Sequence, residues 1–144
     1  MADLRPDESV AGVAPARAPW PLRAMRPVLW VGVAFNLCVA LMLVFPDTLG
    51  GFAALPPVGS AFYRWMLVYF VVLFSATYAW LAVQPVISQA LVGLAALGKA
   101  GVFVVALVCW TRGEVEFRTL AVALVDLVFA AYFMAWLRAT MRYR

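Results

Sequence analysis

Two ionisable residues lie inside long apolar stretches of the sequence, where a charge is most costly. Lys99 lies in the Gly-Lys-Ala-Gly segment 98–101 and is the only lysine of the chain. The next apolar run holds a residue of opposite sign, Asp126, within its span. A charge at the centre of a bilayer costs at least about 3 kcal/mol on insertion scales and therefore needs a partner. The sequence predicts that Lys99 and Asp126 form a buried ion pair.

The depths of the two charges support this pairing. At the helical rise, Lys99 lies roughly 16 Å and Asp126 roughly 14 Å from the outer ends of their runs. Antiparallel neighbouring helices would therefore hold both near the middle of a hydrocarbon core about 30 Å thick. Measured from the other ends, Asn36, Ser75, Lys99 and Asp126 fall at depths of roughly 14, 15, 21 and 18 Å. Each of four helices thus contributes one polar group to a common layer.

The polar layer has two interpretations, and the sequence leaves both open. In the functional one it is a ligand or coupling site, because a carboxylate beside an ammonium can respond to an arriving ligand. In the structural one the ion pair fixes helix register, since breaking a buried pair is strongly destabilising even where the intact pair adds little. Tyr69 and Tyr78 are further candidates, for a lipid or quinone pocket, whereas the tryptophans near the span ends indicate an ordinary interfacial belt.

The composition predicts an integral membrane protein. The chain of 144 residues is 67% hydrophobic and 12% charged, whereas soluble domains are about half apolar and a quarter charged. Apolar runs predict an all-α, antiparallel up-down bundle of four transmembrane helices, with spans at 27–45, 62–83, 86–110 and 117–137. Residues 1–26 are predicted to be a disordered and interfacial tail, residues 27–138 the membrane domain, and residues 139–144 a basic tail. The third span, rich in small residues, is expected to lie innermost.

The distribution of basic residues predicts the orientation. Six arginines flank the two ends of the membrane domain and three lie on the other side; they are Arg17, Arg23, Arg26, Arg138, Arg142 and Arg144, against Arg64, Arg112 and Arg118. The side richer in arginine is expected to be cytoplasmic. Both termini are therefore predicted to be cytoplasmic, in a bacterial inner membrane.

A group of charges is predicted at the outer side. Its members are Arg64, Arg112, Glu114, Glu116 and Arg118. In one interpretation the group is a mouth that attracts a charged ligand or docks a partner subunit. In the other it is a solvated loop whose ion pairs each contribute less than about 1 kcal/mol.

The sequence contains few other groups able to do chemistry. The chain has no histidine, so the commonest metal ligand and proton shuttle is missing. The two cysteines, Cys38 and Cys109, are expected at different depths and do not form a Cys-x-x-Cys motif. No nucleophile–base pair, phosphate loop or basic stripe for nucleic acid is evident. We therefore expect no enzyme activity of this chain alone, no cofactor, no metal and no nucleic-acid partner.

The size, the four spans and the 98–101 segment followed by an intramembrane acid resemble the DoxX-like small bacterial membrane proteins. The likeness covers roughly residues 62–137. It implies a four-helix membrane protein and, for some members, a membrane subunit of a quinone-linked complex. The chain lacks the family's arginine in the first span, so no catalytic residue is carried over. It is also similar in size to small multidrug transporters, which place their carboxylate in the first helix, where this chain has Asn36.

Two functions follow as expectations. The first is an accessory or structural subunit that works in a membrane complex or as a homo-oligomer, in which small residues such as Ala121, Ala123, Ala130 and Ala131 allow close helix packing. The second is a small proton-coupled transporter, or a binder of a lipid or quinone ligand, that uses the polar layer. In both, the lipid bilayer is the first partner.

Overall fold

The computed structural model describes residues 20–56 and 59–142, and the regular structure in these residues is helical. Four long helices are present: α1 (Trp20–Val44), α2 (Ala61–Val83), α3 (Gln89–Thr111) and α4 (Phe117–Arg142). A short π-helical turn, η1 (Pro46–Gly50), follows α1. The predicted tail at residues 1–19 and the last two residues lie outside the described part of the chain.

Each of the four helices is long and apolar enough to cross a membrane. The prediction of four long apolar helices is confirmed, and such a set is the signature of a multi-pass integral membrane protein. The helix ends differ clearly from the predicted spans in three places. Helix α4 continues to Arg142, so residues 139–142 of the predicted basic tail are helical. Helix α1 begins at Trp20 and contains Pro27, so residues 20–26 are helical. Helix α3 begins only at Gln89, where the Ser88 side chain accepts a hydrogen bond from the backbone N–H of Leu91.

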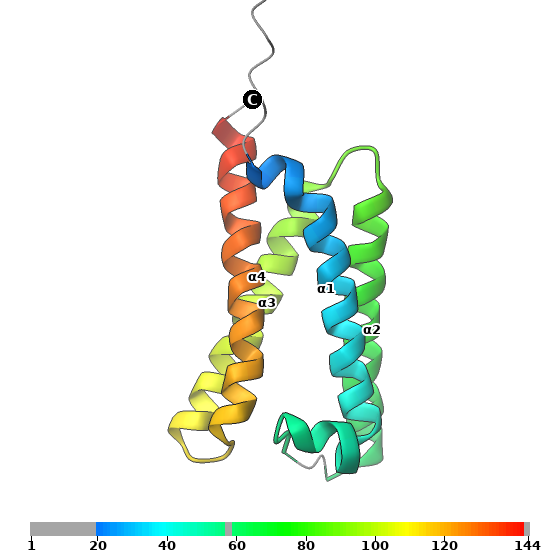
Figure 1. Cartoon of the computed structure of the whole chain (residues 1–144), viewed down its shortest axis with the longest axis vertical. Coiled ribbons are helices and arrows are strands. Elements are labelled where there is room, and N and C mark those ends of the chain that lie inside the picture. The colour runs from blue at the N-terminus through cyan, green and yellow to red at the C-terminus, as the bar shows by residue number, and fades with distance from the viewer. Residues whose placement is uncertain (1–19, 57–58, 143–144) are drawn as a thin grey trace, which may run out of the picture.

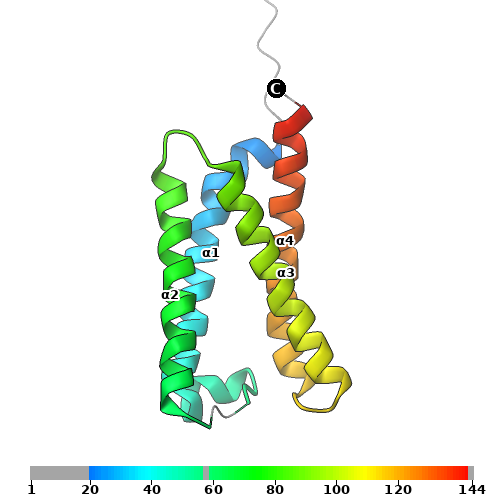
Figure 2. The same cartoon turned by 180° about the vertical axis from the view of Figure 1, so that it is seen from behind.

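The helices pack as two pairs, α1 along α2 and α3 along α4, and the pairs join mainly through α1 and α4. Figure 1 shows the chain descending through α1, ascending α2, descending α3 and ascending α4. The backbones of α2 and α3 come close at few points, and in Figure 2 the ribbon of α3 slants away from α2. The bundle is therefore closed on the α1–α4 side and loose on the α2–α3 side.

Polar contacts tie the helices together at each end of the bundle. At one end, the Arg26 guanidinium of α1 donates hydrogen bonds to the carbonyl oxygens of Gln84, at 2.8 Å, and Pro85, at 3.2 Å. These carbonyls lie where α2 ends, and so have no acceptor role inside the helix. At the other end, the Thr119 hydroxyl of α4 donates to the carbonyl of Ala54 at 2.7 Å, in the segment that follows η1.

The small residues of the third span suggested that this helix lies innermost, but α3 does not. Its buried face is narrow: Leu94, Leu97 and Gly101 are exposed, whereas α4 buries a larger share of its length. Among the glycines of the four long helices, the tightest contact with another helix is made on α1. A Cβ atom built on Gly32 would lie 3.1 Å from Cδ2 of Tyr78. The small residues of the third span therefore did not indicate which helix is the most buried.

Candidate functional site

The buried ion pair predicted from the sequence is present. Nζ of Lys99 on α3 lies 2.5 Å from Oδ1 of Asp126 on α4, and each residue is only 6% exposed. The helical repeat places both charges on interior faces: Val92, Ala95 and Ala96 are buried on the Lys99 side of α3. In α4, Ala123, Phe129 and Ala130 are buried around Asp126. Spacings of three and four residues bring these groups to one face of each helix.

Asn36 completes the cluster from a third helix. Its Oδ1 accepts a hydrogen bond from Lys99 Nζ at 2.7 Å, and Asn36 is 5% exposed. An ammonium has three N–H donors, of which Asp126 and Asn36 use two. The polar cluster, defined as Lys99, Asp126 and Asn36, therefore links α1, α3 and α4 and joins the two helix pairs.

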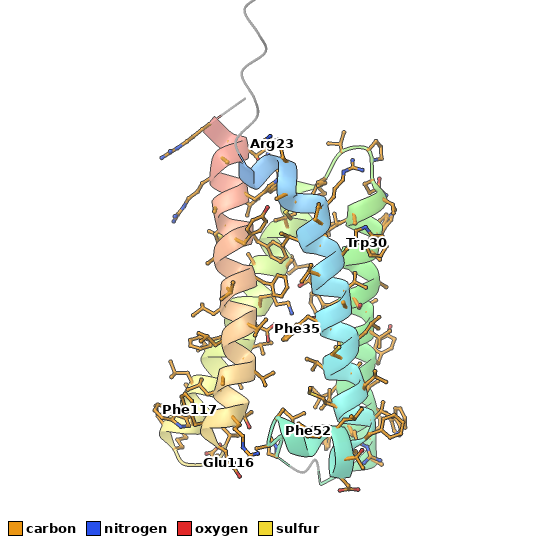
Figure 3. All side chains as sticks on the ribbon, in the orientation of Figure 1. Arg23, Trp30, Phe35, Phe52, Glu116 and Phe117 are labelled. Carbon is orange, nitrogen blue, oxygen red and sulfur yellow. The ribbon has the colours of Figure 1, made fainter. Side chains whose placement is uncertain are left out.

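Three aromatic rings surround the ammonium of Lys99. Nζ lies 4.8 Å from the ring centroid of Phe35, 5.3 Å from that of Phe129 and 5.8 Å from that of Tyr78. Figure 3 shows Phe35 at mid-height of the bundle, far from Arg23 at one end and Glu116 at the other. Ring faces attract a cation, most strongly where water is excluded. The rings thus lower the free energy of a charge held in an apolar interior.

The other two members of the predicted ligand site lie differently. Ser75 is buried at the level of the cluster, but its hydroxyl donates to the Val33 carbonyl of α1 at 3.1 Å rather than to the ion pair. Ser75 therefore joins α2 to α1. Tyr69 is 59% exposed, and its ring contacts the ring of Phe70 at 5.6 Å between centroids. It lies on the outer surface of α2 and does not approach Lys99.

A cavity of about 220 Å³ adjoins the polar cluster. Asn36, Lys99 and Asp126 supply its polar wall. The remaining wall is apolar and aromatic and is formed by Phe35, Val39, Leu67, Phe70, Val71, Phe74, Tyr78, Gly98 and Val102. Leu67, Phe70 and Val102 are also about half exposed on the outer surface of the bundle. The cavity therefore opens sideways between α2 and α3, toward the space that lipid would occupy.

The outer charge group separates into local pairs. Arg112 lies 3.9 Å from Glu114, and Arg118 lies 3.0 Å from Glu116, and all four side chains are more than half exposed. Arg64 lies apart from them, at a hollow that it lines with Asp47. Exposed pairs of this kind contribute little free energy. The geometry agrees with the interpretation of the 112–118 segment as a solvated loop.

Sequence reasoning missed three residues of the site: Phe35, Tyr78 as a neighbour of the ammonium, and Phe129. A signal for two of them was present. Tyr78 lies three residues after Ser75, and Phe129 three residues after Asp126, so each shares a helix face with a residue already placed in the polar layer. Phe35 adjoins Asn36 in sequence, and helical period alone does not direct it to the same site.

The fold and the polar cluster define a small multi-pass membrane protein with a buried Lys–Asp ion pair. In the described residues, no group of three or more metal-ligating side chains gathers, and both cysteines are free thiols. Comparisons with protein-family models, with curated proteins and with solved structures find no match for this chain. The resemblance to DoxX-like proteins stays a prediction.

Proposed function

We propose that the protein is a bacterial inner-membrane protein whose helices cross the bilayer in up-down order, with both termini cytoplasmic. The arginine count supports this orientation. The first and last described residues lie at one end of the bundle (Figure 1), and Arg23 lies there as well (Figure 3). That end would face the cytoplasm, and the 112–118 segment would face the opposite side.

We propose that the polar cluster and its cavity form an intramembrane binding site for an amphipathic, lipid-soluble ligand. The observation that carries the proposal is that the ion pair is not sealed in the core. It forms the wall of a cavity of about 220 Å³ whose rim lies on the lipid-facing surface. Ligand sites are typically apolar hollows with a few polar groups that fix the orientation of the ligand. An ion pair whose one role is to fix helix register would need no cavity beside it.

Photolabelling tests this site. An eight-carbon alkyl diazirine dissolved in the bilayer is expected to label the segments containing Phe74 and Val102 above the lipid-facing background. Gly98→Leu should abolish the excess labelling, because Gly98 lines the cavity and a Cβ there would lie 3.8 Å from the Phe74 ring. Gly101→Leu is the matched control, since a Cβ at Gly101 meets nothing within 4 Å and Gly101 does not line the cavity. Equal labelling of the parent protein, the Gly98→Leu variant and the Gly101→Leu variant would reject an intramembrane ligand site.

The second candidate function is an accessory subunit of a membrane complex or a homo-oligomer, as the DoxX-like resemblance implies. Ala121 and Ala131 support it, because both are exposed on α4, where a second helix could approach closely. Ala123 and Ala130, in contrast, are buried within the chain's own bundle.

Co-purification tests the second candidate function. Extraction in a mild detergent is expected to bring either a stoichiometric partner or a dimer of this chain. Ala131→Trp should dissociate the assembly by steric exclusion, while Val31→Trp, at an exposed apolar position on α1 rather than on α4, serves as the control. A monomer without partner in every mild detergent tested would exclude the accessory role.

A further inference from the structure

We propose that the cavity takes a medium-chain carboxylic acid in its neutral, protonated form, with the carboxyl group against the polar cluster and the alkyl chain toward the α2–α3 opening. This inference rests on the proposed ligand site and names its ligand class. Three properties of the site carry it: net charge, unused hydrogen-bonding groups and volume.

Net charge restricts the ligand to a neutral molecule. The Lys99 ammonium and the Asp126 carboxylate cancel, and they are the only charged groups that line the cavity. An unpaired ion buried in an apolar medium is very unfavourable. A carboxylate anion or an alkylammonium cation would leave one net charge in the site, whereas a protonated acid leaves none. Wherever the acid proton comes to lie, on the ligand or on Asp126, the total remains zero.

The unused hydrogen-bonding groups match a carboxyl group. Lys99 Nζ retains one N–H, and neither Nδ2 of Asn36 nor Oδ2 of Asp126 has a hydrogen-bond partner among the described residues. The cluster therefore offers donors from Lys99 and Asn36 and an acceptor on Asp126, side by side. A carboxyl group has the complementary pair, a carbonyl oxygen that accepts and a hydroxyl that donates. An ester lacks the donor, and an alcohol has one oxygen for both tasks.

The volume sets the length of the alkyl chain. A dry cavity of about 150 Å³ holds benzene with its six heavy atoms. By simple scaling, 220 Å³ holds roughly nine heavy atoms, close to an eight-carbon acid. Longer chains would extend past the rim at Leu67, Phe70 and Val102, which are exposed where the cavity opens. The aromatic and aliphatic lining provides no second polar anchor along the chain.

Competition against the alkyl diazirine in wild-type protein tests the inference without any change to the cluster. Octanoic acid is expected to suppress the Gly98-dependent labelling at about tenfold lower concentration than methyl octanoate, because one further hydrogen bond to a charged group corresponds to about that factor. Octylamine should compete no better than the ester, and 1-octanol, whose single oxygen can donate to Asp126 but lacks the separate carbonyl acceptor, should fall between the ester and the acid. Asn36→Leu should weaken competition by the acid and by the ester alike, because both offer the carbonyl oxygen that Nδ2 of Asn36 would contact.

The outcomes separate this inference from the proposed function. If the diazirine labels the cavity but the acid competes no better than its ester, the carboxylic acid assignment is wrong and the ligand site stands. If octylamine competes best, the site selects cations and the charge argument is overturned. If the diazirine gives no Gly98-dependent labelling, the ligand site itself is rejected.

Discussion

Replacement of Asp126 by leucine is expected to lower the free energy of unfolding by about 3–5 kcal/mol, the range measured when one partner of a buried ion pair is removed. The change leaves the Lys99 ammonium inside the bundle with Asn36 as its one hydrogen-bond partner among the described residues. Lys99→Met is expected to cost a similar amount, because it strands the Asp126 carboxylate. Unfolding in mixed micelles with increasing denaturing detergent measures both.

The matched control lies on the same helix. Val128 is 64% exposed, and Val128→Leu changes an apolar residue without touching the cluster. We expect that variant to stay within about 0.5 kcal/mol of the parent protein, as is usual for exposed substitutions. An Asp126→Leu variant as stable as Val128→Leu would show that the ion pair is absent from the membrane-embedded protein.

The second large effect is expected at Asn36. Asn36→Leu removes the hydrogen bond that its Oδ1 accepts from the ammonium, and hydrogen bonds to charged groups contribute about 1.5–3 kcal/mol. The variant should lose stability in that range, less than the ion-pair variants. Cys38→Leu is the control, since Cys38 lies two residues later on α1 and is exposed. Thermal unfolding in a mild detergent, followed by loss of helical circular dichroism, measures the difference; equal stability of the two variants would remove Asn36 from the cluster.

The fold was predictable at the level of its helices because membrane spans are set by length and apolarity alone. Four apolar runs require four helices, since a spanning backbone must satisfy its hydrogen bonds internally. The residues at which the helices begin and end were less predictable. Residues 20–26 read as an interfacial tail but continue into α1, where Arg26 bonds to carbonyls of the α2–α3 connection. That contact depends on the tertiary arrangement, and local sequence does not encode it.

The depths of the site residues in the membrane were predictable, but the helix faces on which they lie were not. Charge and depth together identified Lys99 and Asp126, because two opposite ions in an apolar layer have no better arrangement than pairing. Aromatic content alone suggested Tyr69 and Tyr78 together as pocket candidates. They are nine residues apart, or about two and a half helical turns, so they face opposite sides of α2. The structure agrees, with Tyr69 exposed and Tyr78 only 1% exposed.

The cavity could not be predicted from the sequence. It lies where the backbones of α2 and α3 come close at few points although their connection is short. That separation is a property of the whole bundle, because it depends on how side chains from all four helices fit together. The charges at 112–118 are close in sequence and form two local pairs, whereas Arg64, grouped with them by its place on the predicted outer side, lines a hollow with Asp47.

The most direct test of the account is the coupling energy between Lys99 and Asp126 from a double-mutant cycle. Lys99→Met, Asp126→Leu and the double variant are compared with the parent protein in the same unfolding assay. The account predicts that the double variant is more stable than either single variant, because it buries no unpaired charge, with a coupling of at least about 2 kcal/mol. Additive losses, with the double variant the least stable of the four proteins, would contradict a paired cluster inside the bundle.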